Sequence, residues 1–332
     1  MNEVLANVFQ LKVPIPNNPL GHTNVYLLRT DDGYMMIDAG FNSQQALEAM
    51  QQQLAELDVD FKKISRIIIT HAHGDHIGLA GKLRELSGAK VVLHRLEKPQ
   101  MRPSARDRES FVQQTEDWMH ANGIPHQEPP PGRSLHEMVR RFEPPPAPDI
   151  TLDDEETIRS DGFSLKVIWT PGHSPGHICL YDASRKVLFS ADHVLPVTTP
   201  NIGLRPGAGG NPLGDYLASL RKVRDLDVDT VLPAHEQVFK DLPGRVDQIL
   251  EHHRHRNEEI IAVLKEGPRT AYQVSERITW MPDSGGVKFH DLGHWDQRMA
   301  VSETLSHLEV LKEQGVVDRY RQDGIIYYRI RR

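Results

Sequence analysis

Short apolar runs alternate with amphipathic stretches along the first 240 residues, and turn residues separate them. The apolar runs are rich in Val, Ile, Leu and Met, as β-strands are. We expect strands at 4–13, 24–29, 34–38, 66–70, 89–94, 165–169, 178–181, 187–189 and 230–232. Apolar residues recur at helical spacing in three other stretches, which are 43–57, 78–87 and 212–226. Because this alternation occurs in two separate blocks, it favours an α/β fold with a two-sheet sandwich over one doubly wound sheet.

The segment 97–149 interrupts this pattern. It combines a charged helical stretch at 105–121 with Pro-Pro-Pro runs at 129–131 and 144–146. An insertion of this kind in a compact fold is usually a lid or an arm, and a disordered linker is the alternative. Its large apolar residues favour at least partial packing. They are Phe111, Trp118, Met119, Met138 and Phe142.

Longer helices follow residue 244. The expected elements are helices at 245–265, 270–279 and 297–314 and strands at 316–317 and 325–330, joined by a tight Asp-Gly turn at 323–324. Helix, helix, helix, hairpin is the order of elements in a winged helix. We therefore predict a first domain over 1–244, with the insertion inside it. A linker helix and a small winged-helix-like domain are expected over 245–332.

Composition and charge narrow the function classes. The formal net charge is −7, so the chain has no general attraction to nucleic acid or to an anionic membrane. No run approaches the ~20 apolar residues of a membrane span, and residues 1–16 lack the pattern of a signal peptide. The one cysteine, Cys179, allows no internal disulfide and is expected in the core. These features predict a cytoplasmic protein without membrane contact.

Candidate metal ligands come directly after the predicted strand 66–70. The stretch 70–76 reads Thr-His-Ala-His-Gly-Asp-His and contains four ligand-type side chains, His71, His73, Asp75 and His76. Imidazole nitrogens and carboxylates are ligands of zinc, and four such groups cannot all face an apolar core without partners. A polar, His-rich surface loop is the alternative interpretation.

Three further strand ends carry ligand-type residues, His173, Asp192 and His235. The seven residues are enough for two ions that share a bridging ligand. The expected three-His site consists of His71, His73 and His173. The expected second site consists of Asp75, His76 and His235. Asp192 can reach both ions as the bridge.

This ligand set predicts a hydrolytic mechanism. Two ions ~3.5–4 Å apart hold a hydroxide between them and lower its pKa toward ~7. That hydroxide is the expected nucleophile, and one ion polarises the substrate oxygen. Asp75 is the expected catalytic residue, because it can orient the hydroxide or carry its proton. We expect two divalent ions, with Zn²⁺ preferred and iron or manganese as alternatives.

Four motifs in this order strongly resemble the metallo-β-lactamase superfamily. They are His-x-His-x-Asp-His, Pro-Gly-His-Ser-Pro-Gly-His, Ala-Asp-His and Pro-Ala-His, and the resemblance covers about residues 4–240. It implies an αββα sandwich with the metals at one edge of the two sheets. It also implies that His173 is the ligand in the Pro-Gly-His repeat and that Asp38, in Ile-Asp-Ala-Gly, supports the metal loop. His177 then either supports a ligand or simply bonds to the backbone.

Asp192 narrows the resemblance to the glyoxalase II-like, lactonase and nuclease-like branches, which keep the bridging carboxylate. Some zinc β-lactamases have a cysteine there, which Cys179 does not match, so a β-lactamase is disfavoured. An iron-dependent oxygen or redox role is also disfavoured, because no Gly-rich flavin loop is present. We therefore expect hydrolysis of a thioester, ester or lactone of a small molecule.

The alternative function is a nuclease, because the tail from 267 resembles the winged-helix domain attached to some glyoxalase-like hydrolases and to a mitochondrial endoribonuclease. Lys+Arg and Asp+Glu balance over 251–332, whereas a phosphate-binding domain should be basic. We expect the tail instead to wall the active site or to form a homodimer contact. His193 faces away from the ligands unless the turn brings it to substrate. The His-rich run 252–256 is expected on a solvated helix face, with an approach to the pocket as the alternative.

Overall fold

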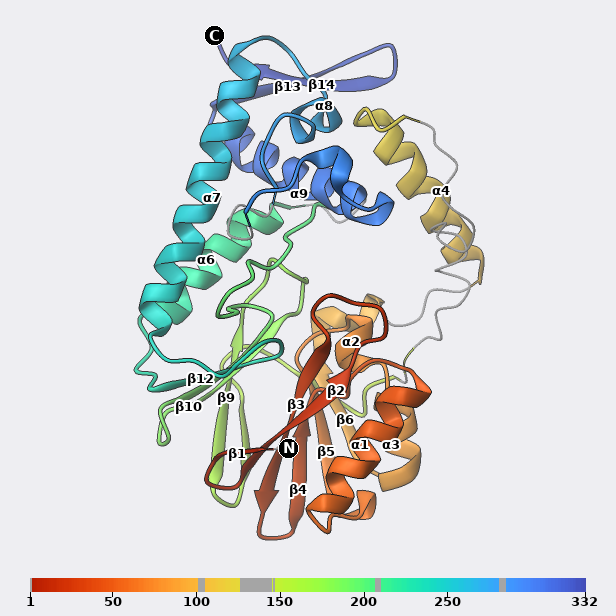
Figure 1. Ribbon diagram of the computed structural model, residues 1–332, viewed down its shortest axis with the longest axis vertical. Coiled ribbons are helices and arrows are strands. Elements are labelled where there is room, and N and C mark those ends of the chain that lie inside the picture. The colour runs from red at the N-terminus through yellow and green to blue at the C-terminus, as the bar shows by residue number, and fades with distance from the viewer. Residues whose placement is uncertain (1, 101–104, 126–144, 146, 207–209, 281–284) are drawn as a thin grey trace. The chain divides into compact units, whose positions relative to one another are not determined.

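The computed structural model describes residues 2–100, 105–125, 145, 147–206, 210–280 and 285–332 (Figure 1). The chain forms two compact units, each with its own apolar core. Unit 1 comprises Met1–Arg102, Pro144–Pro200 and Ser219–Val246. Unit 2 comprises Pro103–Glu143, Asn201–Ala218 and Asp247–Arg332. This grouping differs from the predicted division at 244, because most of the insertion and the segment 201–218 belong with the C-terminal residues.

The first sheet of unit 1 has seven strands among the described residues, in the order β1 to β7. They are β1 Asn2–Leu5, β2 Val8–Pro14, β3 His22–Thr30, β4 Gly33–Ile37, β5 Ile64–Ile69, β6 Lys90–His94 and β7 Ile150–Leu152. Strands β1 to β4 pair antiparallel, and β4 to β7 pair parallel. Helices α1 (Gln44–Glu56) and α3 (Ala80–Ser87) connect the parallel strands. Because β4 and β5 are neighbouring parallel strands, their C-terminal ends lie side by side.

The second sheet has five strands among the described residues, in the order β12-β11-β10-β9-β8. They are β8 Thr157–Ser160, β9 Phe163–Trp169, β10 Ile178–Asp182, β11 Val187–Ala191 and β12 Thr230–Pro233. Only the β11–β12 pair is parallel among the described pairs of this sheet. Helix α6 (Pro212–Arg224) lies between these two strands in the chain.

Alternation along the strands divides the core of unit 1 into two layers. In β5, Ile67 and Ile69 pack with residues of α1 and α3, whereas Ile68 packs with residues of the second sheet. Tyr26 and Phe189 meet between the sheets, with ring centroids 5.4 Å apart. The predicted αββα sandwich is therefore confirmed. Cys179 in β10 is buried as expected, and burial raises the pKa of its thiol to about 12.

Two predicted helices of unit 1 are confirmed, with caps that their sequences provide. The Ser43 side chain accepts a hydrogen bond from Ala46 N at the start of α1, and Gly88 ends α3 with a left-handed φ of 75°. The prediction of one strand over 4–13 was wrong. Asn7 adopts a φ of 64°, so the chain turns there and β1 folds back on β2.

Unit 2 is mainly helical. Its elements include α4 (Ala105–Ala121), α8 (Ala271–Ser275), α9 (His294–Glu313), β13 (Val317–Gln322) and β14 (Ile325–Ile330), together with residues 247–265 of α7 (Leu242–Lys265). Trp118, Ile124 and Leu204 pack against the core of these elements. This packing explains why segments from inside the predicted first domain belong to unit 2. Helix, helix, helix, hairpin is the observed order, and a winged-helix identity stays a prediction.

The run 252–256 was expected to lie on a solvated helix face, but two of its residues are buried. His253 and Arg256 are 1% and 3% exposed, because they lie on the side of α7 that faces the core of unit 2. His253 Nδ1 lies 3.3 Å from His307 Nε2, and the Arg256 guanidinium lies 4.6 Å from the Trp280 ring centroid.

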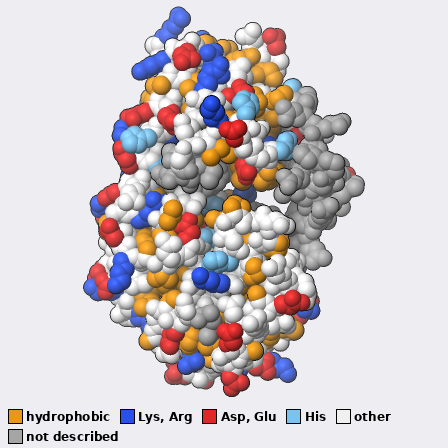
Figure 2. Space-filling model, in the orientation of Figure 1, with side chains coloured by type: hydrophobic (Ala, Val, Ile, Leu, Met, Phe, Trp, Pro, Cys, Tyr) orange, Lys and Arg blue, Asp and Glu red, His pale blue; other side chains and the backbone are white. Residues whose placement is uncertain are grey.

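The described surface carries charges of both signs. On the face drawn in Figure 2, Lys and Arg side chains are interspersed with Asp and Glu, and its described residues form no broad basic field of the kind that binds phosphate backbones. Within the described ranges, no helix combines the length and apolar character needed to cross a bilayer.

Candidate metal centre

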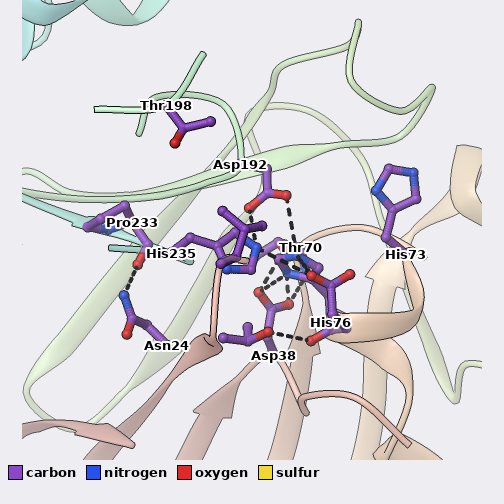
Figure 3. A network of polar contacts seen from close by, with 12 residues as sticks. Asn24, Asp38, Thr70, His73, His76, Asp192, Thr198, Pro233 and His235 are labelled. Atoms are coloured by element: carbon purple, nitrogen blue, oxygen red, sulfur yellow. Dashed lines mark hydrogen bonds and ion pairs between the residues drawn. The ribbon is translucent and has the colours of Figure 1, made fainter. Parts of the chain in front are cut away.

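The seven predicted ligands of unit 1 come together where four strands end. His71 and His73 follow β5, and Asp75 and His76 lie on the short helix α2 (Gly74–Ile77). The other three ligands follow strands of the second sheet, with His173 after β9, Asp192 after β11 and His235 after β12. The site therefore draws on both sheets of the sandwich (Figure 3).

Three histidines form one candidate ion site. His73 Nδ1 lies 3.0 Å from His71 Nε2 and 2.9 Å from His173 Nε2. Nitrogens that surround a tetrahedral zinc ion lie about 3.3 Å from one another, given Zn–N distances of about 2.0–2.1 Å. The three ring nitrogens thus have the spacing of ligands to a single ion.

Asp75, His76 and His235 form a second candidate site. Asp75 Oδ2 lies 3.6 Å from His76 Nε2 and 3.3 Å from His235 Nε2. These atoms also fit the spacing of ligands around one ion, with a carboxylate oxygen as the third ligand.

Asp192 lies between these two groups, and Figure 3 shows its carboxylate directed toward His76 and His235. Its Oδ2 is 3.4 Å from His173 Nε2 and 3.4 Å from His76 Nε2, and its Oδ1 is 3.3 Å from His235 Nε2. One carboxylate therefore faces ligands of both groups. This is the position expected of a bridging ligand.

Buried polar atoms at this position fit a cation. His76 Nε2, His235 Nε2 and Asp192 Oδ1 are buried and make no hydrogen bond among the described residues. An unsatisfied buried polar atom costs about 1–3 kcal/mol, so three together at one point need a common partner. A cation is a partner for all three, and a set of imidazole and carboxylate donors suits zinc and other divalent transition metals.

Electrostatics at the site favour positive charge, which either protons or bound cations can supply. Burial, together with nearby imidazoles, holds the pKa of His71 well below its usual range, so the ring is neutral and able to coordinate. Burial would raise the pKa of Asp75, but the charge of His76 and the contact with His235 lower it to about 2. Burial likewise would lower the pKa of His235, but Asp192 and Asp75 raise it to about 10. The carboxylates thus draw positive charge to this point.

Asp38 connects directly to the ligands, in keeping with the role that the resemblance implies. Its carboxylate is buried and accepts hydrogen bonds from Thr70 N and Thr70 Oγ1, at 2.8 and 3.0 Å. Its other oxygen lies 2.8 Å from His76 Nδ1. An anion at Nδ1 places the proton there and leaves His76 Nε2 for an ion.

The loop that carries His235 depends on residues that the sequence did not single out. Asn24 Nδ2 donates to Pro233 O and Glu236 O, at 3.0 and 2.9 Å, and the Tyr26 hydroxyl donates to Pro233 O at 2.7 Å. Both side chains are buried on β3. A polar Asn inside a strand of buried apolar residues was the available signal, because such a residue needs a hydrogen-bond partner.

His177 and His193 lie behind the ligands. The His177 ring is buried 5.1 Å from the His71 ring, and its Nδ1 is 2.8 Å from Thr170 Oγ1. It therefore bonds to a side chain rather than only to backbone. His193 is fully buried, and burial lowers its pKa to about 3. This burial argues against contact between His193 and a substrate.

Comparisons with known proteins agree with this geometry. The family model of the metallo-beta-lactamase superfamily matches residues 18–235, so the chain belongs to that superfamily. A crystal structure of a metallo-beta-lactamase family protein from Thermus thermophilus is 32% identical, with a TM-score of 0.82 and coverage of 99% of this chain and 100% of that one. That similarity therefore extends through both units.

Two curated relatives are also similar over most of this chain. The probable metallo-hydrolase YqjP of Bacillus subtilis is 26% identical, over 97% of this chain and 98% of its own length. The atrochrysone carboxyl ACP thioesterase of Aspergillus fumigatus is 24% identical, over 92% of this chain but only 59% of its own length.

Proposed function

We propose that this metallo-hydrolase uses two divalent ions to hydrolyse a thioester or a related ester or lactone of a small molecule. The position of Asp192 supports the proposal, because its carboxylate lies 3.3–3.4 Å from ligand nitrogens of both groups. A single ion would leave one of these groups without a partner. Zinc is the proposed metal, since the ligands are imidazoles and carboxylates.

When bound, the ions would supply a hydroxide near neutral pH and would polarise the carbonyl under attack. His71, His73 and His173 would hold one ion, and Asp75, His76 and His235 would hold the other. Asp75 has a second task, because its side chain is 23% exposed and can reach the reacting groups from the solvent side. Its other oxygen, Oδ1, would accept the nucleophile's proton and deliver it to the leaving group.

A thioester is the preferred substrate class within this proposal. The Aspergillus fumigatus relative carries the name of a thioesterase. Asp192 also fits the glyoxalase II-like branch, which keeps a carboxylate as the bridge. A thiolate is a good leaving group, so it departs with little need of a proton donor, and Asp75 can return the proton that it accepted.

The decisive experiment combines metal analysis with hydrolysis of a generic acyl thioester. We expect two ions per wild-type chain and measurable thiol release. Asp75→Asn keeps a ligand oxygen but removes the proton acceptor, so turnover should fall by about 10²–10⁴-fold while metal stays bound. Asp58→Asn is the matched control, because Asp58 is exposed and lies in the same unit. Wild-type turnover in Asp75→Asn, or a single bound ion in the wild type, would contradict the proposal.

A further inference from the structure

A buried carboxylate outside the ligand set contacts two of the ligand loops. Glu97 lies in the short helix Arg95–Gln100 that follows β6, and it is 0% exposed although its neighbour Lys98 is exposed. A buried carboxylate is costly unless hydrogen bonds satisfy its oxygens. The partners of Glu97 therefore show what it does.

Both oxygens of Glu97 accept hydrogen bonds from loops that carry metal ligands. Oε2 accepts from Ala72 N at 2.9 Å, and Ala72 lies between two ligands, His71 and His73. Oε1 accepts from Ser174 Oγ and Gly176 N, both at 2.6 Å, and Ser174 directly follows the third histidine ligand. One side chain thus joins the two loops that supply the whole three-His group.

The glycine of the second loop is explained by the same contact. A Cβ on Gly176 would lie 2.8 Å from Glu97 Cγ and from Glu97 N, and 3.0 Å from His94 Nδ1. Such distances are too short for any side chain, so the loop can approach Glu97 only with glycine at this position. The two 2.6 Å hydrogen bonds that Glu97 Oε1 accepts are charge-assisted, and such bonds are roughly twice as strong as neutral ones. The loop backbone is therefore shaped to meet this carboxylate.

We infer that Glu97 is a positioning residue that sets the separation of the two loops and so tunes the affinity of the three-His site. This inference rests on the proposed two-ion centre. Glu97 acts on the histidines through residues beside them, by its hydrogen bonds with Ala72 N, Ser174 Oγ and Gly176 N. Residues that orient metal ligands in this indirect way typically change metal affinity by about 10–100-fold when they are replaced.

The test variant is Glu97→Gln, which keeps the size of the side chain. An amide has one acceptor oxygen, so its NH₂ group must face either Ala72 N or the Ser174 and Gly176 donors. We expect one of the two ions to bind about 10–100-fold more weakly, while the other changes by less than about threefold. Titration of the metal-free protein with Zn²⁺ against a chromogenic chelator measures both affinities. Glu85→Gln, on an exposed side chain, is the matched control and should bind both ions as the wild type does.

A second variant identifies which ion is affected. His235→Gln removes a nitrogen ligand of the second group and should weaken the other ion, so the double variant with Glu97→Gln should weaken both. If the double variant weakens only one ion, the assignment of Glu97 to the three-His site is wrong. Ser174→Ala removes one donor to Glu97 and should weaken the same ion to a smaller extent, with an effect that is not additive to Glu97→Gln. If Glu97→Gln does not fold, Ser174→Ala provides the test of the inference instead.

The outcomes separate this inference from the proposed function. Two ions in the wild type with unchanged affinities in both Glu97→Gln and Ser174→Ala would overturn the inference and leave the two-ion centre intact. One ion in the wild type would overturn the two-ion centre. In that case Glu97 keeps its assigned role only if Glu97→Gln weakens that ion. Equal weakening of both ions in Glu97→Gln would mean a general structural role and would also overturn the inference.

Discussion

Replacement of Asp38 by Asn should destabilise unit 1 without changing the shape of the side chain. The carboxylate accepts from Thr70 N and Thr70 Oγ1 through one oxygen and contacts His76 Nδ1 through the other, with heavy-atom distances of 2.8–3.0 Å. An Asn has only one acceptor oxygen, so it can accept from Thr70 or from His76 but not from both. Its NH₂ group would then face the other donor without forming a hydrogen bond. Asp38 also has a left-handed φ of 62°. Asn tolerates this conformation well, so backbone strain is not a second cause.

The magnitude follows from the lost contact. A hydrogen bond to a charged group contributes about 1.5–3 kcal/mol, and a buried donor left without a partner costs about 1–3 kcal/mol. Because the loop can relax in part, we expect the free energy of unfolding of unit 1 to fall by roughly 2–4 kcal/mol. That loss corresponds to an increase of about 30- to 1000-fold in the unfolding equilibrium constant.

Hydrogen exchange of metal-free protein, followed by mass spectrometry of peptides from β5, measures unfolding of this unit alone. The matched control is Asp58→Asn, because Asp58 also has a left-handed φ, of 55°, but is exposed. We expect the control to stay within about 0.5 kcal/mol of the wild type, as surface substitutions usually do. Equal protection of β5 peptides in both variants would refute the view that the Asp38 anion fixes the loop.

Two further predictions concern other parts of the chain. Burial lowers the pKa of His253 to about 3 in the folded protein, whereas an unfolded histidine binds a proton near pH 6.5. The unfolded state therefore binds more protons between these values, and His253 should contribute about 1.4 kcal/mol per pH unit to the fall in the free energy of unfolding of unit 2 as the pH drops from 6.5 toward 3. Urea unfolding at several pH values measures this slope. His253→Gln should reduce the slope, whereas substitution of an exposed histidine, His255→Gln, should leave it unchanged. Equal slopes in the two variants would contradict the role of His253. Tyr26→Phe removes the hydroxyl that donates to Pro233 O at 2.7 Å, so it should cost unit 1 about 1 kcal/mol in urea unfolding, and an unchanged midpoint would contradict this role.

The sequence was informative wherever a local pattern carries the chemistry. Apolar runs that end at His or Asp identified four strand ends, and the sandwich brings those four ends together. This worked because a strand's direction and length fix where its last side chains lie. The break at Asn7 was missed, because apolar residues continue on both sides of it and one left-handed residue leaves no periodic signal.

Contacts between distant segments could not be predicted in this way. Glu97 accepts hydrogen bonds from residues 25 to 79 positions away, and it begins the segment 97–149, which was interpreted from sequence as a lid, an arm or a linker. Trp118 and Ile124 join the core of unit 2 although the chain continues from them into unit 1. Neither arrangement has a period or a turn signal, since each depends on which surfaces meet after the sheets have formed.

Charge balance gives an independent reason to prefer two ions over one. Asp75 and Asp192 lie among the ligand atoms, and Asp38 and Glu97 lie directly behind them. The ion pairs of Asp75, Asp192 and Asp38 are with imidazoles, which bring positive charge only when protonated. Four carboxylates in so small a region repel one another strongly when water is excluded. Before the hydroxide forms, two divalent ions supply four positive charges that balance the four carboxylates and leave every imidazole neutral, which is the form that coordinates a metal. One ion would leave two negative charges, which protons on His76 and His235 would have to balance. A protonated imidazole cannot coordinate a metal, so the second group would then lose its nitrogen ligands.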